Sequence, residues 1–388
     1  MTRRSPLAGF GLGAILLAVW PAAASPFHEP KRWLFVALTA VAVGLTVRDV
    51  RRWSVAALPL VVMTTLRPSV DALAFAWALV AWPALASDRQ RALELVRWSG
   101  ALVALVVLAQ ALGVDPLASF QPEGLTVRLA RYGTLGNPDF VASALLPIAV
   151  LCAPRAGDVV GLLRLLLICV ALTLTESLAA VLGAALAVAA WLAHLRAHGG
   201  VVDPKVPRRT TRLLVSALLL LLALPLLSRD VERALRGRLY LVAVALPHVA
   251  EAPLLGQGPG AVVEGWPRWE LEHWQARCAD ATCVQQHPDG RFTGLQDHVH
   301  ADWLEVVLER GLLGLAALLV ALGVALRTAW RNPQGAPVFA ALVAALTRTL
   351  VDFPLERPAD LAVLAFLVSL APPEANEPAD VAPAPRGR

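Results

Sequence analysis

Charged residues are scarce in this chain of 388 residues. They make up 16% of it, against 57% hydrophobic residues and a mean hydropathy of +0.62, whereas a soluble protein carries about 25% charged residues. The apolar residues stand in continuous blocks, and about 20 apolar residues in a helix cross a bilayer. These properties exclude a soluble globular protein and predict an all-α, polytopic membrane protein.

Lysine is nearly absent: almost all of the 34 basic residues are arginine. The net charge of the chain is +5. A basic balance in a soluble protein would favour a nucleic-acid partner, but here no aromatic residues alternate with the basic ones to stack on bases. The arginines gather in the short loops on one side of the predicted membrane, which marks that side as cytoplasmic. We therefore expect membrane lipid and no nucleic acid as a partner, and both termini in the cytoplasm.

About twelve transmembrane helices are predicted, with a large periplasmic loop between the ninth and the tenth. The predicted spans lie near 7–24, 31–47, 53–66, 69–86, 97–113, 138–153, 161–175, 177–195, 212–227, 307–327, 335–351 and 359–372. The first of these also resembles a signal peptide. The predicted organisation is transmembrane helices one to nine in 1–227, a periplasmic loop with an interfacial helix in 228–302, helices ten to twelve in 303–372, and a disordered cytoplasmic tail in 373–388.

There are only four cysteines. Cys152 and Cys169 lie in or beside apolar segments and are expected to be inert. Cys278 and Cys283 lie five residues apart in the long polar loop, where an oxidising compartment would favour a disulfide between them. Two free thiols are the alternative.

Two histidines, His298 and His300, stand where this loop meets an apolar helix. A histidine in such a place has enough contact with solvent to exchange protons and is buried enough to make directed contacts. This position favours a role in proton transfer. Two other interpretations stay open: an interfacial pair of polar residues, or half of a metal site. No second ligand cluster is visible to complete a metal site, and we expect no metal and no cofactor.

The loop begins with an amphipathic segment that carries Arg229, Arg233 and Arg236. It is typical of an interfacial helix on anionic lipid, and it equally fits an arginine cluster for phosphate. Glycines 256, 258 and 260 predict a tight turn. Three tryptophans follow, at 266, 269 and 274, either as an aromatic belt at the membrane surface or as a platform for sugar rings.

Further polar residues stand at the outer ends of the predicted spans. Asn137 is a candidate helix cap and Pro138 a first helical residue, whereas Arg131 has no such structural explanation. Arg348 lies within an apolar segment, where a charge is by default functional, although a pair with Asp352 at helical spacing would also explain it. The predicted outer face carries arginines and a histidine, and it has no Asp-x-Asp pair that would hold a metal-bound sugar nucleotide. This favours a donor that is already activated, such as a glycan on a polyprenyl pyrophosphate.

Four stretches resemble the O-antigen ligase/polymerase family of bacterial membrane glycosyltransferases. They are GTLGNPDFVASALLP at 133–147, RLYLVAVALPHVAEAPLLGQGPG at 238–260, HVHADWLEVVLERGLLG at 298–314 and LVDFPLERPADLAVLAF at 350–366. The third is similar to the family pattern His-Ala-His-Asn-Asp-x-Leu followed by Glu-x-Gly-x-x-Gly. Their order and spacing also match the family over roughly 130–370.

The resemblance implies metal-independent transfer of a glycan from undecaprenyl pyrophosphate, with inversion at the sugar carbon, at the periplasmic face of the bacterial inner membrane. It places the essential histidine at His300 and pyrophosphate-binding arginines at Arg238, Arg131 and Arg348. Further candidates for substrate binding are His298, Asn137 and Arg233. The chain departs from the family at Asp139, Ala301 and Leu178, and the third departure removes an expected arginine.

The acceptor stays open between lipid A–core, as for an O-antigen ligase, and a growing polysaccharide, as for a polymerase. Protein O-glycosylation is a third possibility within the family. Outside it, the alternatives are a transporter of a small anion such as bicarbonate and a non-catalytic partner in envelope assembly. A transporter should carry polar, broken helices near the membrane midplane, whereas the charges here collect at the outer edge.

Overall fold

The computed structural model describes residues 6–20, 22–23, 25–47, 57–85, 88–120, 129–152, 158–198 and 231–371. Helices are the only regular elements in these ranges, and no strand occurs among them. The predicted ninth span (212–227), the predicted tail (373–388) and Arg229 lie outside the described residues. The all-α prediction is confirmed for the part of the chain that is described.

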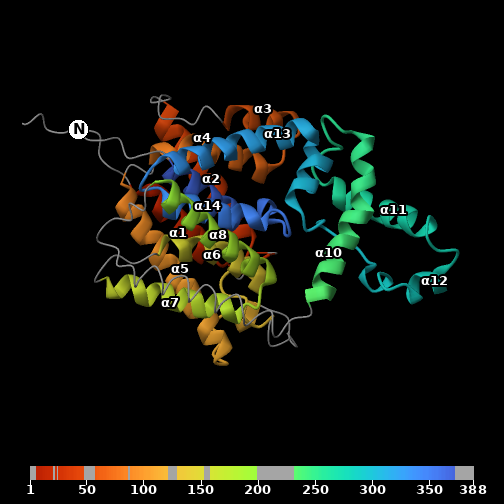
Figure 1. Cartoon of the computed structure of the whole chain (residues 1–388), viewed down its shortest axis with the longest axis horizontal. Coiled ribbons are helices and arrows are strands. Elements are labelled where there is room, and N and C mark those ends of the chain that lie inside the picture. Colours follow the sequence, from red (N-terminus) through yellow and green to blue (C-terminus); the bar gives the residue numbers. More distant parts are fainter. Residues whose placement is uncertain are drawn as a thin grey trace, which may run out of the picture.

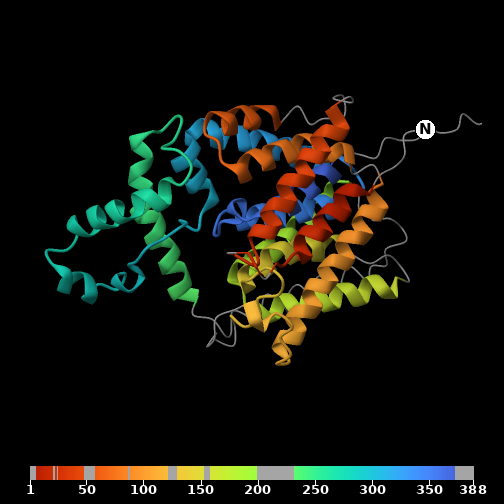
Figure 2. The same ribbon diagram turned by 180° about the vertical axis from the view of Figure 1, so that it is seen from behind.

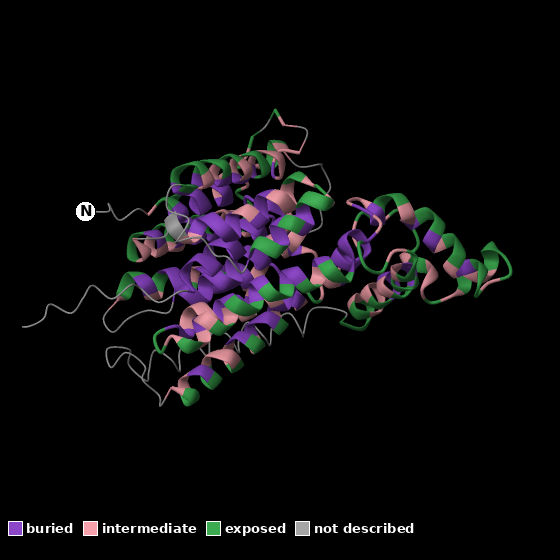
Figure 3. Cartoon of the chain, turned by 90° about the horizontal axis from the view of Figure 1, so that it is seen from above, coloured by how far each residue is buried: buried purple, intermediate pink, exposed green. Residues whose placement is uncertain are grey.

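Apolar helices form a bundle from which the segment 231–300 projects (Figures 1 and 2). Its helices are α1 (Leu7–Leu17), α2 (Glu29–Thr46), α3 (Leu58–Leu66), α4 (Val70–Leu85), α5 (Arg89–Ala111), α6 (Pro138–Leu151), α7 (Val159–Leu174), α8 (Leu178–Ala197), α13 (Asp302–Arg331), α14 (Ala336–Arg348) and α15 (Pro358–Leu370). A short 3₁₀ turn, η3, spans Ala118–Phe120. Figure 3 shows that buried residues fill the bundle interior.

Each predicted span other than 212–227 overlaps one of these helices, although several boundaries differ. The first helix ends at Leu17 rather than near residue 24, and α5 begins eight residues before its predicted span, at a cap where Asp88 accepts a hydrogen bond from the Arg91 backbone. By length and composition α5, α8 and α13 are each able to cross a membrane, whereas the other apolar helices are shorter. Hence the structure supports a membrane protein, and the number of crossings stays a prediction.

Residues 231–300, which precede α13, fold as a small helical unit, here called the loop domain. It contains α10 (Val231–Ala245), η4 (Leu246–Glu251), α11 (Ala261–Gln275), α12 (Ala281–Gln286) and η5 (Gly290–Phe292). Figure 3 shows more exposed surface on this unit than on the bundle. The predicted disulfide between Cys278 and Cys283 is confirmed.

The three loop tryptophans form the core of the loop domain, so both earlier interpretations of them are wrong. Trp266 and Trp269 are fully buried and Trp274 nearly so, packed with Tyr240 and Val299 among others. Indole rings bury more apolar surface than most side chains, and a unit this small needs them inside it. They are therefore unable to act as a membrane belt or an open sugar platform.

The loop domain joins the bundle through a break in α13 at Gly311, whose φ of 68° and ψ of −176° are not helical. The glycine-rich turn lies against this break. Gln257 and Gly258 donate backbone hydrogen bonds to the carbonyls of Leu308 and Glu309, at 2.7 and 3.1 Å, and Leu312 donates to the carbonyl of Pro253 at 2.8 Å. Backbone groups freed inside an apolar helix must find such partners, so the two glycine motifs form one joint.

The joint requires glycine on both sides. A Cβ added at Gly311 would lie 2.1 Å from the Leu254 carbonyl oxygen, and one added at Gly256 would lie 2.3 Å from the Arg310 backbone nitrogen. Both glycines also have positive φ angles, which other residues adopt only with strain.

Gly311→Ala is expected to lower stability by about 2–4 kcal/mol, combining backbone strain with steric overlap. Gly323→Ala in the same helix is the matched control, because a Cβ there meets nothing within 4 Å. Thermal unfolding of both purified variants in detergent would check this. Equal melting temperatures would contradict the description of the joint.

Candidate active site

His300 lies just before α13, where the segment 298–302 packs on the segment 349–353. The backbone nitrogen of Asp302 donates to the carbonyls of Thr349 and Asp352, at 3.0 and 3.2 Å. This contact places His300 Nδ1 3.5 Å from Asp352 Oδ1 and sets its ring edge-to-face on Phe353, with centroids 4.7 Å apart. His300 has a positive φ of 53°, a strained conformation for a residue other than glycine.

His298 points to a different partner. Its Nδ1 lies 2.7 Å from Glu305 Oε1, and its ring stacks on Phe353 with centroids 4.2 Å apart. Glu305 is buried. Thus the two histidines contact the same phenylalanine ring, His298 by stacking and His300 edge-to-face, and of the two only His300 lines the pocket described below.

Asp352 is the centre of a buried ion cluster behind His300. Arg348 Nη2 lies 2.6 Å from Asp352 Oδ2, and Arg357 Nη2 lies 3.4 Å from the same oxygen. Burial opposes ionisation of this carboxyl, but Arg357, Arg348 and the contact with His300 outweigh it and hold the pKa of Asp352 below its ordinary value. An ionised Asp352 can orient the His300 ring through Nδ1.

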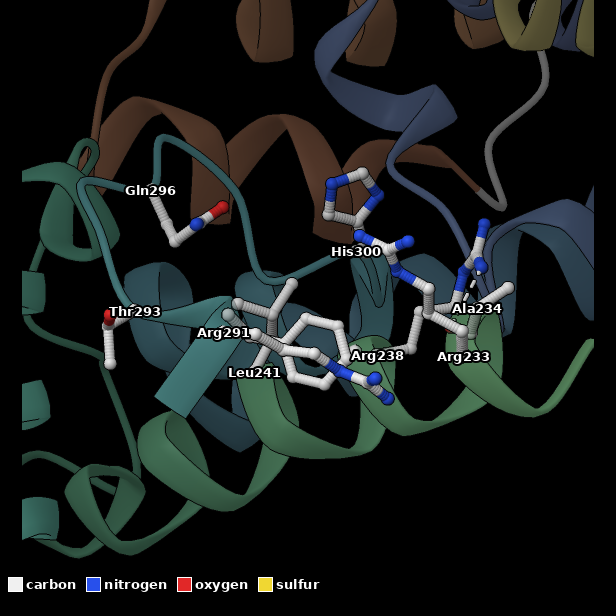
Figure 4. A pocket seen from close by; sticks show the side chains of 10 residues that line it. Arg233, Ala234, Arg238, Leu241, Arg291, Thr293, Gln296 and His300 are labelled. Atoms are coloured by element: carbon white, nitrogen blue, oxygen red, sulfur yellow. Dashed lines mark hydrogen bonds between the residues drawn. The ribbon is translucent and has the colours of Figure 1, made fainter. Parts of the chain in front are cut away.

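A pocket of about 670 Å³ opens in front of His300. Its lining residues are Arg233, Ala234, Gly237, Arg238, Leu241, Arg291, Phe292, Thr293, Gln296 and His300, and none of these described residues is acidic. Figure 4 shows His300 across the pocket from α10, which carries Arg233, Arg238 and Leu241. Three guanidinium groups with no carboxylate in the lining make this a pocket for an anion.

Arg238 has a fixed geometry in this pocket. Its Nε donates to the carbonyl of Val351 at 2.7 Å, and its Nη1 donates to the carbonyl of Ala234 at 3.2 Å. The first contact ties α10 to the segment that carries Asp352. The predicted residues Arg233, Arg238 and His300 are therefore brought together.

The other predicted residues lie outside the pocket lining. Arg348 is fully buried, and besides Asp352 it donates to Ser177 Oγ at 2.9 Å and to the Asp139 carbonyl at 2.9 Å. The predicted pair with Asp352 is confirmed. Arg348 thus reaches the start of α8, beside Leu178, where the family resemblance implies an arginine.

Arg131 and Asn137 lie on the α6 side of the bundle. Arg131 Nη1 donates to the Leu174 carbonyl at 3.0 Å and lies 3.2 Å from Glu176 Oε1. Asn137 caps α6, and its side chain accepts from the Asp139 backbone at 2.8 Å, as predicted. Both have structural roles here, and a role in substrate binding stays a prediction.

Two elements of the site were missed from the sequence. Arg291 stands in the short turn η5, where no periodicity marks it. Asp352 was seen only as a partner of Arg348, although the family-like stretch 350–366 places it near His300. In the described chain no three His, Cys, Asp or Glu residues are arranged to hold a metal ion.

Asp352→Asn is expected to destabilise the protein by about 3–5 kcal/mol near pH 7, because it leaves the fully buried Arg348 with a neutral partner, whereas Arg357 keeps its ion pair with Asp360 at 2.7 Å. Since its pKa is lowered on folding, the ionised carboxylate stabilises the fold above about pH 4, and this contribution is lost as the pH falls below that value. The difference in melting temperature between wild type and variant should therefore shrink only in acid.

The exposed carboxylate of Asp297, three residues before His300, supplies the control variant Asp297→Asn. That variant should melt like the wild type at every pH. An Asp352→Asn protein with wild-type stability at pH 7 would rule out the buried ion cluster.

No curated protein matches the chain significantly. A family model described as O-antigen ligase matches residues 162–319. This range includes the whole loop domain, and with it α10, His298 and His300. The predicted resemblance to the O-antigen ligase/polymerase family is thereby confirmed over residues 162–319, which contain the second and third of the four motifs.

Proposed function

We propose that this chain transfers a glycan from undecaprenyl pyrophosphate to an acceptor hydroxyl at the periplasmic face of the bacterial inner membrane. The family match supports glycan transfer in polysaccharide assembly. The observation that carries the finer proposal is the pocket in which Arg233, Arg238, Arg291 and His300 meet without an acidic lining residue. Such a set of guanidinium groups is suited to bind a pyrophosphate, and a base such as His300 can accept the proton of an acceptor hydroxyl.

The proposed reaction is a single displacement at the sugar carbon. The acceptor oxygen forms a bond to this carbon as the bond to the pyrophosphate oxygen breaks, and His300 accepts the hydroxyl proton. Because His300 Nδ1 faces Asp352, Nε2 is the nitrogen available to the acceptor. The pyrophosphate leaves with the bonding electrons, and the arginines stabilise the charge that it gains.

The arrangement of the site supports these roles. Asp352 and Phe353 fix the His300 ring, and the contact between Arg238 and the Val351 carbonyl holds a phosphate-binding group on the same backbone segment. These contacts hold His300, the proposed base, at a fixed position relative to Arg238 in the proposed pyrophosphate site. Arg131, Arg348, His298 and Asn137 stay secondary candidates for substrate contacts, since none of them lines the pocket.

The periplasmic placement is supported by two independent features. Arginine is concentrated in the loops on the opposite side of the predicted membrane, and the disulfide between Cys278 and Cys283 belongs to an oxidising compartment. Lipid A–core, a growing polysaccharide and a protein side chain are the candidate acceptors. A small-anion transporter is the second candidate function, because an arginine pocket also attracts bicarbonate.

The test replaces the native protein in its host by His300→Ala and compares the surface-glycan profile with that of a deletion strain. His300→Ala should abolish the product as the deletion does, at a normal protein level, since removal of a general base costs about 100- to 10,000-fold in rate. His198→Ala, at the C-terminal end of α8, should leave the profile intact.

The products separate the possible acceptors. Long chains left on the lipid carrier would indicate a ligase, and single repeat units on lipid A–core would indicate a polymerase. A deletion that changes the profile while His300→Ala does not would show that His300 is not the base. If neither strain changes, the transporter becomes the better account.

A further inference from the structure

We infer that residues 278–293 form a strap whose disulfide-closed loop holds Arg291 in place as a third cation for the donor's pyrophosphate. This inference rests on the proposed function and extends it to a residue that the family motifs do not contain. Arg291 and Phe292 form one wall of the pocket, and α10 with Arg233 and Arg238 forms the other. The strap is anchored at three points.

The first anchor is the disulfide itself, which closes the turn between α11 and α12 with Cα atoms 5.4 Å apart. Cys278 donates its backbone hydrogen bond to the Trp274 carbonyl at 2.8 Å, at the buried end of α11. Asp280 caps α12 by accepting from the Cys283 backbone nitrogen at 2.8 Å. The short helix α12 is thereby fixed to the tryptophan core, although it has only six residues.

The second anchor joins α12 to the turn that carries Arg291. Gly290 packs so closely on α12 that a Cβ there would lie 1.9 Å from the Val284 carbonyl oxygen. Gly290 also donates its backbone hydrogen bond to the His287 carbonyl at 2.9 Å, and the His287 ring packs edge-to-face on Trp274 at 5.3 Å. The position of the turn therefore follows the position of α12.

The third anchor is Phe292, which packs on α10 where that helix has a glycine. A Cβ added at Gly237 would lie 3.2 Å from Phe292 Cε1, and the Phe292 ring lies 6.1 Å from that of Tyr240. The Arg291 guanidinium lies over the Phe292 ring, 4.8 Å from its centroid. A guanidinium over an aromatic face keeps its hydrogen-bond donors available at its edge.

The third cation matters for the chemistry. A sugar-linked pyrophosphate gains a further negative charge on the leaving oxygen as the bond to the sugar breaks. A cation already in place stabilises that charge more than it stabilises the bound substrate. The strap holds Arg291 at the pocket before the reaction begins, so the entropic cost of ordering this side chain is not added to the activation barrier.

The experiment uses the full-length protein in proteoliposomes with a lipid-linked glycan donor and its acceptor, and it measures kcat and KM. Arg291→Gln is expected to lower kcat/KM about 10- to 100-fold, the usual effect of one charge-assisted hydrogen bond, with most of the loss in kcat. Arg277→Gln is the control, because Arg277 lies just before the strap, contacts only the His273 carbonyl among the described side-chain hydrogen bonds, and is absent from the pocket lining.

The role of the strap is tested by the double variant Cys278→Ser/Cys283→Ser and by mild reduction of the folded wild type with dithiothreitol. Both should lower kcat/KM in the same direction as Arg291→Gln. In the Arg291→Gln background neither should cause a further loss, because the disulfide acts through Arg291. Dithiothreitol should leave the double serine variant unchanged.

Three results would overturn the inference: wild-type kinetics for Arg291→Gln, wild-type kinetics after loss of the disulfide, or losses that multiply when the changes are combined. The last would mean that the disulfide only supports folding. Failure of the proposed function gives a different result, since then neither His300→Ala nor Arg238→Gln would change donor turnover.

Discussion

The backbone hydrogen bonds between the glycine-rich turn at 253–258 and the break in α13 determine where the loop domain lies on the bundle. They satisfy backbone groups that an interrupted apolar helix would otherwise leave unpaired, at a cost of several kcal/mol each. They also fix α10 relative to the beginning of α13. Since Arg238 is on α10 and His300 directly precedes α13, the distance between the phosphate-binding group and the proposed base depends on this joint.

A second constraint acts from the bundle side. Asp352, Arg348 and Arg357 are all buried, and each would be costly alone. Together they form a charged layer that contacts His300 through Asp352 and the start of α8 through Ser177. Arg357 also lies 4.3 Å from the centroid of the Phe140 ring. The same residues thus hold α6, α8 and α14 together and orient the His300 imidazole. This cluster of charged residues therefore serves both the stability of the bundle and the proposed reaction.

The sequence predicted what depends on local or periodic patterns. The apolar blocks located the helices, the Asn137-Pro138 pair predicted a capped helix, the spacing of Arg348 and Asp352 predicted their ion pair, and the spacing of the loop cysteines predicted their disulfide. Composition is a reliable guide to membrane helices because the bilayer imposes it. The motifs also identified Arg238 and His300, which do meet at one pocket.

Contacts between distant segments were beyond such patterns. The tryptophans were expected at a surface because nothing local shows that α10, α11 and residues near 299 enclose them. Arg291 was missed because only the packing of α12 and Phe292 brings it to the pocket. The break at Gly311 was missed because a glycine within an apolar run does not show by itself that a turn elsewhere in the chain packs against it. In each case tertiary packing decides the role of a residue whose sequence context is unremarkable.

The most direct test of this account is an experimental structure of the protein in lipid with undecaprenyl pyrophosphate bound. The account predicts that the pyrophosphate lies between α10 and η5, with guanidinium groups of Arg233, Arg238 and Arg291 on its oxygens and His300 beside the site that the sugar carbon would occupy. Pyrophosphate bound at Arg131 and Glu176 on the α6 side, with the arginine pocket empty, would contradict it.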